Sequence, residues 1–108
     1  MSDVEKIKAL NDSLRQTRIG GRIVLTCGVR VKGESTILLL LDKLRRFDNF
    51  TEDNDPHGEH DFGQIEHDGC KYFWKIDYYD LALQMHSPNA ADPSVTCRVL
   101  TLMLAEEY

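Results

Sequence analysis

The sequence predicts an α+β fold, in which a mostly antiparallel sheet of three or four strands carries helices packed on one face. Apolar residues recur at helical spacing in residues 4–14 and 37–47, which indicates two helices that each bury one side. An Asp68-Gly69 pair separates two segments of alternating hydrophobicity, which is a strong hairpin signal. The full predicted order is α-β-α-β-β-β-α. A length of 108 residues suits one domain and is too short for two, so we expect a single domain over residues 1–108.

A helix and a short strand come first. Ser2-Asp3-Val4-Glu5 has the form of a capping box, in which the Ser2 side chain accepts from the Glu5 amide, so a helix begins here. Gly20 and Gly21 permit the left-handed backbone that ends such helices. Residues 22–29 are rich in β-branched side chains and predict a strand.

A second helix and a hairpin follow. Residues 34–47 carry a wide apolar stripe and a basic last turn, which predicts a largely buried helix. Residues 62–66 and 70–78 are the two predicted arms of the hairpin. The side chains that we expect to face the core from the second arm are Cys70, Tyr72, Trp74, Ile76 and Tyr78.

Two further elements complete the prediction. Residues 81–86 alternate apolar and polar side chains and predict a third sequential strand after the hairpin turn. Asp92 then precedes Pro93, which places a capping carboxylate before a proline suited to the first helical position. An apolar stripe follows, so we expect a final helix over residues 93–106. Its inward residues are Val95, Val99, Leu102 and Met103.

Composition limits the classes of protein that fit. No run approaches the ~20 apolar residues of a membrane span, and the amino terminus lacks the basic and apolar regions of a signal peptide. We therefore expect a cytoplasmic protein that does not bind membranes. Cys27, Cys70 and Cys97 are odd in number and dispersed, so we expect free core thiols.

Negative charge is concentrated in one segment. Residues 47–70 contain eight acids and no Lys or Arg, which leaves ten acids against thirteen bases elsewhere. The acids of this segment are Asp48, Glu52, Asp53, Asp55, Glu59, Asp61, Glu66 and Asp68. Such a field repels phosphates and favours cations or a basic protein. We therefore expect no direct nucleic-acid binding and assign the aromatic residues of 72–79 to the sheet.

Residues 53–63 form the candidate site, and a metal is one interpretation of it. The Asp-x-Asp-x-x-Gly spacing resembles the start of a calcium loop, but Pro56 interrupts it and Gln64 stands where a bidentate Glu is needed. A transition metal could use imidazole and carboxylate ligands instead. The alternative ligand set is Asp53, Asp55, His57 and His60. Because the pattern is incomplete, we expect no metal and no other cofactor.

Two other interpretations remain for the same residues. His60 with Glu59 or Asp61 could carry acid-base catalysis, although no nucleophile motif accompanies them. The segment could instead fold its own turn and present acids to a partner. The expected partner-binding residues are Asp48, Glu52, Asp53, Asp55, Glu59 and Asp61. We expect His60 and Asp61 to matter more to the fold than His57, which lies at the predicted loop tip.

Five motifs stand out along the chain: RIVLT at 22–26, NDPHGEHDFG at 54–63, FWKIDYYD at 73–80, RVLT at 98–101 and AEEY at 105–108. Together they resemble a family of small proteins of unknown function from alphaproteobacteria, their plasmids and phages. The departure from the family pattern lies in residues 33–41, away from the candidate site. The resemblance implies an accessory protein of mobile elements, a group that includes antirestriction and anti-CRISPR inhibitors. We therefore expect stoichiometric binding of a basic or nucleic-acid-binding protein. A metal-dependent or acid-base hydrolase is the alternative.

Overall fold

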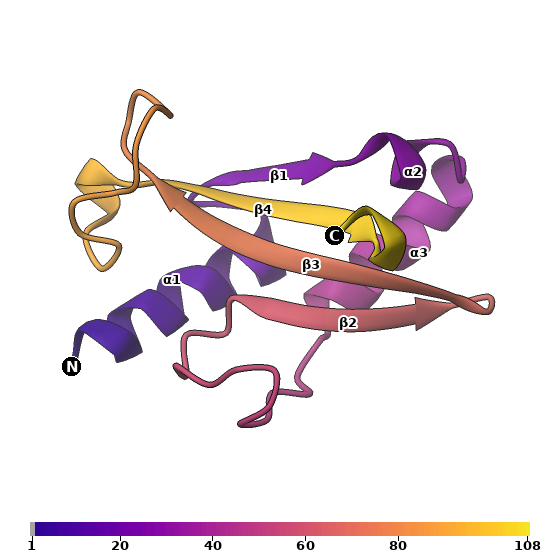
Figure 1. Cartoon of the computed structure of the whole chain (residues 1–108), viewed down its shortest axis with the longest axis horizontal. Helices are drawn as coiled ribbons and strands as arrows, with labels where there is room; N and C mark the ends of the chain where they lie inside the picture. Colours follow the sequence, from indigo (N-terminus) through magenta and orange to yellow (C-terminus); the bar gives the residue numbers. More distant parts are fainter. Residues whose placement is uncertain (1) are drawn as a thin grey trace.

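The sheet contains four strands in the order β1-β4-β3-β2, in a computed structural model that describes residues 2–108. β1 runs parallel to β4, whereas β3 is antiparallel to both β4 and β2. Helices α1 and α3 lie together on one face of this sheet (Figure 1). The α+β fold with a mostly antiparallel sheet is therefore confirmed. In chain order the elements are α1 (Asp3–Thr17), β1 (Arg22–Leu25), α2 (Cys27–Arg30), α3 (Glu34–Arg45), β2 (Phe62–His67), β3 (Cys70–Tyr79), η1 (Pro93–Val95), β4 (Cys97–Leu104) and η2 (Ala105–Glu107).

The start of α1 and the turn of the hairpin are formed by the residues that the sequence indicated. The Ser2 side chain accepts from the Glu5 amide at 3.2 Å and begins α1. The helix ends at the left-handed residue Arg18, before the glycines that we expected to end it. Asp68 and Gly69 both have positive φ, 52° and 77°, as a two-residue hairpin turn with primed geometry requires.

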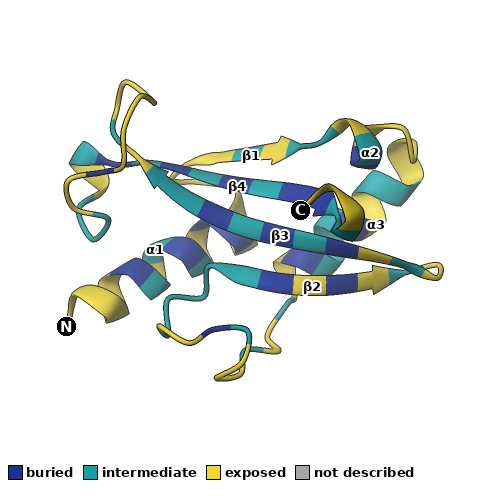
Figure 2. Cartoon of the chain, in the orientation of Figure 1, coloured by how far each residue is buried: buried dark blue, intermediate teal, exposed yellow. Residues whose placement is uncertain are grey.

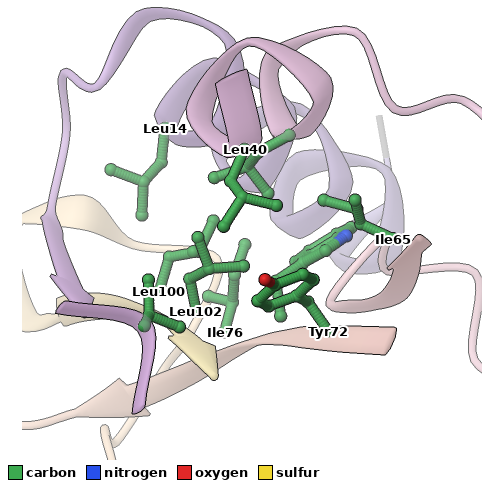
Figure 3. Close-up of a cluster of buried hydrophobic side chains, with 10 residues drawn as sticks. Leu14, Leu40, Ile65, Tyr72, Ile76, Leu100 and Leu102 are labelled. Atoms are coloured by element: carbon green, nitrogen blue, oxygen red, sulfur yellow. The ribbon is translucent and has the colours of Figure 1, made fainter. Parts of the chain in front are cut away.

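The core lies between the two helices and the sheet. Figure 3 shows Leu14 from α1 and Leu40 from α3 pointing toward the sheet, where Leu100 and Leu102 meet them. Trp74 is fully buried at the centre of β3, which confirms the predicted phase of that strand. Burial of side chains of this size contributes about 1.5–3 kcal/mol each, so this layer dominates the stability of the fold.

Two early elements are shorter than predicted. The strand expected over residues 22–29 ends at Leu25, because the chain turns into α2 where Glu107 accepts from the Thr26 hydroxyl and the Gly28 amide. The helix expected over 34–47 ends at Arg45, and Leu38 and Leu39 on its outer side are more than half exposed. The cysteines are free as expected, but Cys27 is exposed and is not a core thiol.

Residues 81–86 do not form the predicted strand. A tight loop closes on Asp80, whose amide donates to the Met85 carbonyl and whose carboxylate accepts from the Gln84 amide. Among the described residues, the segment 81–86 pairs with β3 through one isolated bridge, between His86 and Tyr79. The alternating apolar side chains therefore point to solvent and do not face a core. They are Leu81, Leu83 and Met85.

The predicted helix over residues 93–106 is wrong. The cap is present, since the Asp92 carboxylate accepts from the Ser94 amide, but only the short η1 follows it. The chain then enters β4, which pairs with β1 on one side and with β3 on the other. Every second side chain of β4 points into the core, namely Arg98, Leu100 and Leu102. This period of two is the one expected for a strand, here between β1 and β3.

Candidate functional site

A structured loop between α3 and β2, here called the acidic loop (residues 48–61), forms the candidate site. Figure 2 shows that this loop combines exposed portions with a buried one. Asn54 organises its first half, because the side chain accepts from the Thr51 amide and donates to the Asn49 carbonyl, both at 2.8 Å. The Asp55 amide also donates to the Thr51 carbonyl at 2.8 Å. The first half of the loop is therefore held by hydrogen bonds among its own residues, independently of its contacts with the rest of the molecule.

His60 connects the acidic loop to α1. Its Nδ1 lies 2.9 Å from Asp12 Oδ1, and its Nε2 lies 3.8 Å from Asp55 Oδ2. Its ring stacks on Phe50 with centroids 3.7 Å apart and an interplanar angle of 3°. The His60 backbone has φ of 57°, in the left-handed region, while its amide donates to Asp55 Oδ1 at 3.1 Å. The imidazole is thus held by two carboxylates and an aromatic ring.

Arg15 holds the start of the acidic loop from the same helix. Its guanidinium donates to the Phe47 carbonyl at 2.8 Å, just beyond α3, and to Asp12 Oδ1 at 3.0 Å. It also lies over the rings of Phe50 and Trp74, at 5.5 and 5.7 Å from their centroids. Because only 3% of Arg15 is exposed, Asp12 is fixed between this buried cation and the His60 ring.

A second polar network joins the end of the acidic loop to β3 and β4. The Asn11 amide donates to the Tyr78 hydroxyl at 2.8 Å and to the Glu59 carbonyl at 3.0 Å, while Tyr78 donates to Glu59 Oε1 at 2.8 Å. Arg98 is 1% exposed and donates to Asn11 Oδ1 at 2.6 Å and to the Ala90 carbonyl. Burial raises the pKa of Tyr78 and lowers the pKa of Arg98. Tyr78 therefore remains a neutral hydrogen-bond donor to the Glu59 carboxylate.

Asp61 is the acid whose environment least favours its charge. Burial, followed by the negative charge of Glu59, raises the pKa of Asp61. Its main chain is fixed to the sheet, because its carbonyl accepts from the Ile76 amide at 2.8 Å. A carboxyl group that holds its proton more tightly than usual is suited to acid-base chemistry, and His60 is its neighbour in the chain.

The structure divides the residues that the sequence singled out into two groups. Those exposed to solvent are Asp48, Glu52, Asp53 and His57. The second group is buried or half-buried and contacts the rest of the molecule or the base of the loop. Its members are Asp55, Glu59, His60 and Asp61. The proposed metal ligands are thus split between the two groups. Among residues 2–108, no group of three or more His, Cys, Asp or Glu side chains is arranged to hold a metal ion.

The sequence reasoning did not identify the residues that anchor the acidic loop from outside it. Asn11 lies on the inward side of α1 between Ile7 and Leu14, so a polar residue within an apolar stripe was the available signal. Arg98 lies on the core face of β4 and was hidden by the helical prediction for that segment. Asp12 and Arg15 carried no local signal of their own, because their partners lie far away in the sequence.

Two shallow pockets on the described surface lie away from the acidic loop. One is lined by residues of β3, η2 and the α2–α3 connection, and the other lies near Gly20, Gly21 and Arg22. Within residues 2–108, no helix has the length and apolar character needed to cross a membrane. The candidate site thus combines exposed carboxylates of the acidic loop with a buried polar base.

Comparisons with known proteins identify a family. Neither the curated proteins nor the solved structures that were compared include a match. Residues 25–107, well over half of the chain, match the family described as "Protein of unknown function (DUF3768)". The matched region includes the whole acidic loop, Tyr78 of β3 and Arg98 of β4, whereas Asn11, Asp12 and Arg15 of α1 lie before it. The chain belongs to the DUF3768 family.

Proposed function

We propose that this protein binds a basic protein partner stoichiometrically through the exposed carboxylates of the acidic loop. The observation that carries the proposal is that some acids of the acidic loop are exposed while others hold the loop in place. Asp48, Glu52 and Asp53 face solvent, while Asp55 and Glu59 accept hydrogen bonds that hold the loop in place. The segment has no Lys or Arg that would neutralise the exposed charges.

Preorganisation makes this surface suitable for binding. Association costs free energy when loops must become ordered at the interface. Here the Asn54 hydrogen bonds and the His60 anchor already fix the backbone that displays the acids. The exposed charges can therefore contribute electrostatic attraction without a large ordering cost, chiefly by accelerating and orienting association.

The chemistry of the partner follows from the sign of this charge. A carboxylate surface repels nucleic acid but complements the surfaces with which proteins bind phosphates. A nucleic-acid-binding protein is therefore the partner class that we propose, with this protein competing against DNA or RNA. We further propose that it inhibits a host defence system of the antirestriction or anti-CRISPR type, which is what the resemblance of its sequence motifs to small alphaproteobacterial mobile-element proteins implies.

Charge reversal tests the proposal. A triple variant, Asp48→Lys, Glu52→Lys and Asp53→Lys, should lose the partner that the wild-type protein captures from host lysate, with its circular dichroism spectrum unchanged. The matched control reverses three exposed acids outside the loop, Asp3→Lys, Glu34→Lys and Glu66→Lys, and should retain capture. Both variants change net charge equally, so retention by both, or loss by both, would contradict a loop-specific surface.

An acid-base hydrolase is the second candidate, and the raised pKa of Asp61 beside the Asp12-oriented His60 is the observation that favours it. Turnover of a small ester or phosphodiester that disappears in His60→Ala and persists in the triple variant would establish the hydrolase.

A further inference from the structure

A pocket of about 240 Å³ lies at the hairpin end of the sheet, away from the acidic loop. It forms where the start of β3 meets η2 and the connection between α2 and α3. Its lining residues are Lys32, Cys70, Lys71, Leu104, Ala105 and Glu106. The pocket thus places a thiol beside the Lys32 ammonium, and its lining residues carry two formal positive charges against one negative charge although the whole protein is acidic.

Cys70 and Lys32 are in direct contact within this pocket. The Lys32 ammonium donates to Cys70 Sγ at 3.7 Å, and Cys70 is only partly buried, so its sulfur can be reached by a small molecule. The Lys32 ammonium beside the sulfur attracts a negatively charged reagent to it, and a thiolate is the nucleophile in disulfide exchange. Burial raises the pKa of Tyr72, the next residue on the same side of β3, so its phenol stays neutral and adds no negative charge.

The hairpin places Cys70 at this position. Asp68 and Gly69 form the turn, and Cys70 is the first residue of β3, opposite His67 of β2. Its side chain lies on the helix-covered side of the sheet, at the end where that cover stops. The same alternation that buries Tyr72 and Trp74 therefore leaves Cys70 at the edge of the core, accessible from the pocket.

We propose that Cys70 is a modification site that reacts with anionic low-molecular-weight disulfides. The Cys70 thiolate attacks one sulfur of the small disulfide, a new sulfur–sulfur bond forms to Cys70, and the original disulfide bond breaks. The bonding electron pair leaves with the second sulfur, which takes up the proton that the Cys70 thiol released. The pocket is smaller than the ~300 Å³ of a typical ligand site, so it holds only part of the reagent while Lys32, in contact with the sulfur, attracts a carboxylate of that reagent.

The chain contains its own reference thiol. Cys27 is exposed at the first turn of α2, and within residues 2–108 it has no hydrogen bond to a lysine comparable with that of Cys70. Exposure alone therefore predicts that Cys27 reacts faster. The cationic pocket predicts instead that Cys70 reacts faster with an anionic disulfide, and that this advantage falls with a cationic one.

The test measures the rate of mixed-disulfide formation at each cysteine by mass spectrometry of peptides from the whole protein. The probes are glutathione disulfide, which is anionic, and cystamine, which is cationic. We expect the ratio of the Cys70 rate to the Cys27 rate to be higher for glutathione disulfide. Lys32→Gln should lower the Cys70 rate by about fivefold, the effect of one unit charge at ~4 Å in a water-like medium, and leave Cys27 unchanged.

The matched control is Lys6→Gln, which removes an exposed ammonium of α1 and should alter neither rate. Cys70→Ser confirms the assignment of the modified peptide. A Cys70 rate that shows no preference for the anionic probe, or that is unchanged in Lys32→Gln, would overturn the proposal. Because both lysines are exposed, loss of folding does not compete with this interpretation, and unchanged thermal unfolding of each variant verifies it.

Discussion

Replacement of His60 should destabilise the protein far more than replacement of His57, although the two are separated by only two residues. His60→Ala removes a hydrogen bond to Asp12, a contact with Asp55 and a stacked ring on Phe50. A hydrogen bond of this kind contributes about 0.5–1.5 kcal/mol and an aromatic stack about 0.5–1.5 kcal/mol. The His60 side chain is 22% exposed, so part of each contribution is screened, and we expect a loss of about 1–2 kcal/mol in the free energy of unfolding.

His57→Ala is the matched control. His57 lies exposed between Pro56 and Gly58, and a surface replacement of this kind usually changes stability by less than about 0.5 kcal/mol. Urea unfolding followed by Trp74 fluorescence measures both variants, because Trp74 is the single tryptophan and is fully buried. Each kcal/mol corresponds to a fall in Tm of about 4–8 °C for a domain near this size.

A double-mutant cycle locates the effect. Asp12→Ala also removes the carboxylate that accepts from Arg15, so its single-variant cost exceeds that of the His60 contact alone. The interaction energy of Asp12→Ala with His60→Ala isolates the pair and should be about 0.5–1.5 kcal/mol. Equal stability of His57→Ala and His60→Ala, or additive losses in the cycle, would refute the anchoring role of His60.

Two further changes test the surroundings of the site. Burial and the charge of Glu59 raise the pKa of Asp61 above its ordinary value of 3.8, so the folded protein binds this proton more tightly than the unfolded chain does. The stability contributed here is therefore full below the ordinary pKa and is lost as pH rises through the raised value, so Asp61→Asn should raise Tm at pH 7 and not at pH 3. A lower Tm for Asp61→Asn at pH 7 would show that its carboxylate is instead stabilised. Gly63→Ala should cost about 1–3 kcal/mol, because the new Cβ would meet the Trp74 indole nitrogen and come within 2.6 Å of Phe47 Cζ. Gln64→Ala, at the next and exposed position of β2, is its control in the same urea assay, and equal stability of the two would show that the core yields at this point.

The hairpin could be predicted from the sequence because all of its signals are local. The Asp68-Gly69 turn and the alternation around Trp74 agree, and both arms need only each other to establish their register. β4 could not be recognised in the same way, since the stripe in residues 93–106 also fits a helix and Asp92-Pro93 forms a genuine cap. Only the pairing with β1 and β3 on both sides decides between the two periods, and that pairing is a long-range property.

For the candidate site too, the local features could be predicted and the long-range contacts could not. The position of His60 beside the first hairpin strand indicated a structural contact, and its charge-rich neighbours were visible. Its partner Asp12 lies 48 residues earlier in the sequence, and nothing local to either residue indicates that they meet. The acidic run also concealed that Asp55 and Glu59 turn inward, because the sequence shows charge but not the direction of a side chain.

The position of β4 in the chain has a consequence for folding during synthesis. β1 ends at Leu25, yet its only strand partner within residues 2–108 begins at Cys97, roughly 70 residues later. At about 5–20 residues per second, a ribosome needs roughly 4–14 s to deliver that partner. During this interval β1 has no strand partner, and α1 and α3 can contact only a sheet that lacks β4. The core cannot be completed before β4 has been made, so apolar side chains of β1 and of the two helices stay exposed on the nascent chain until then.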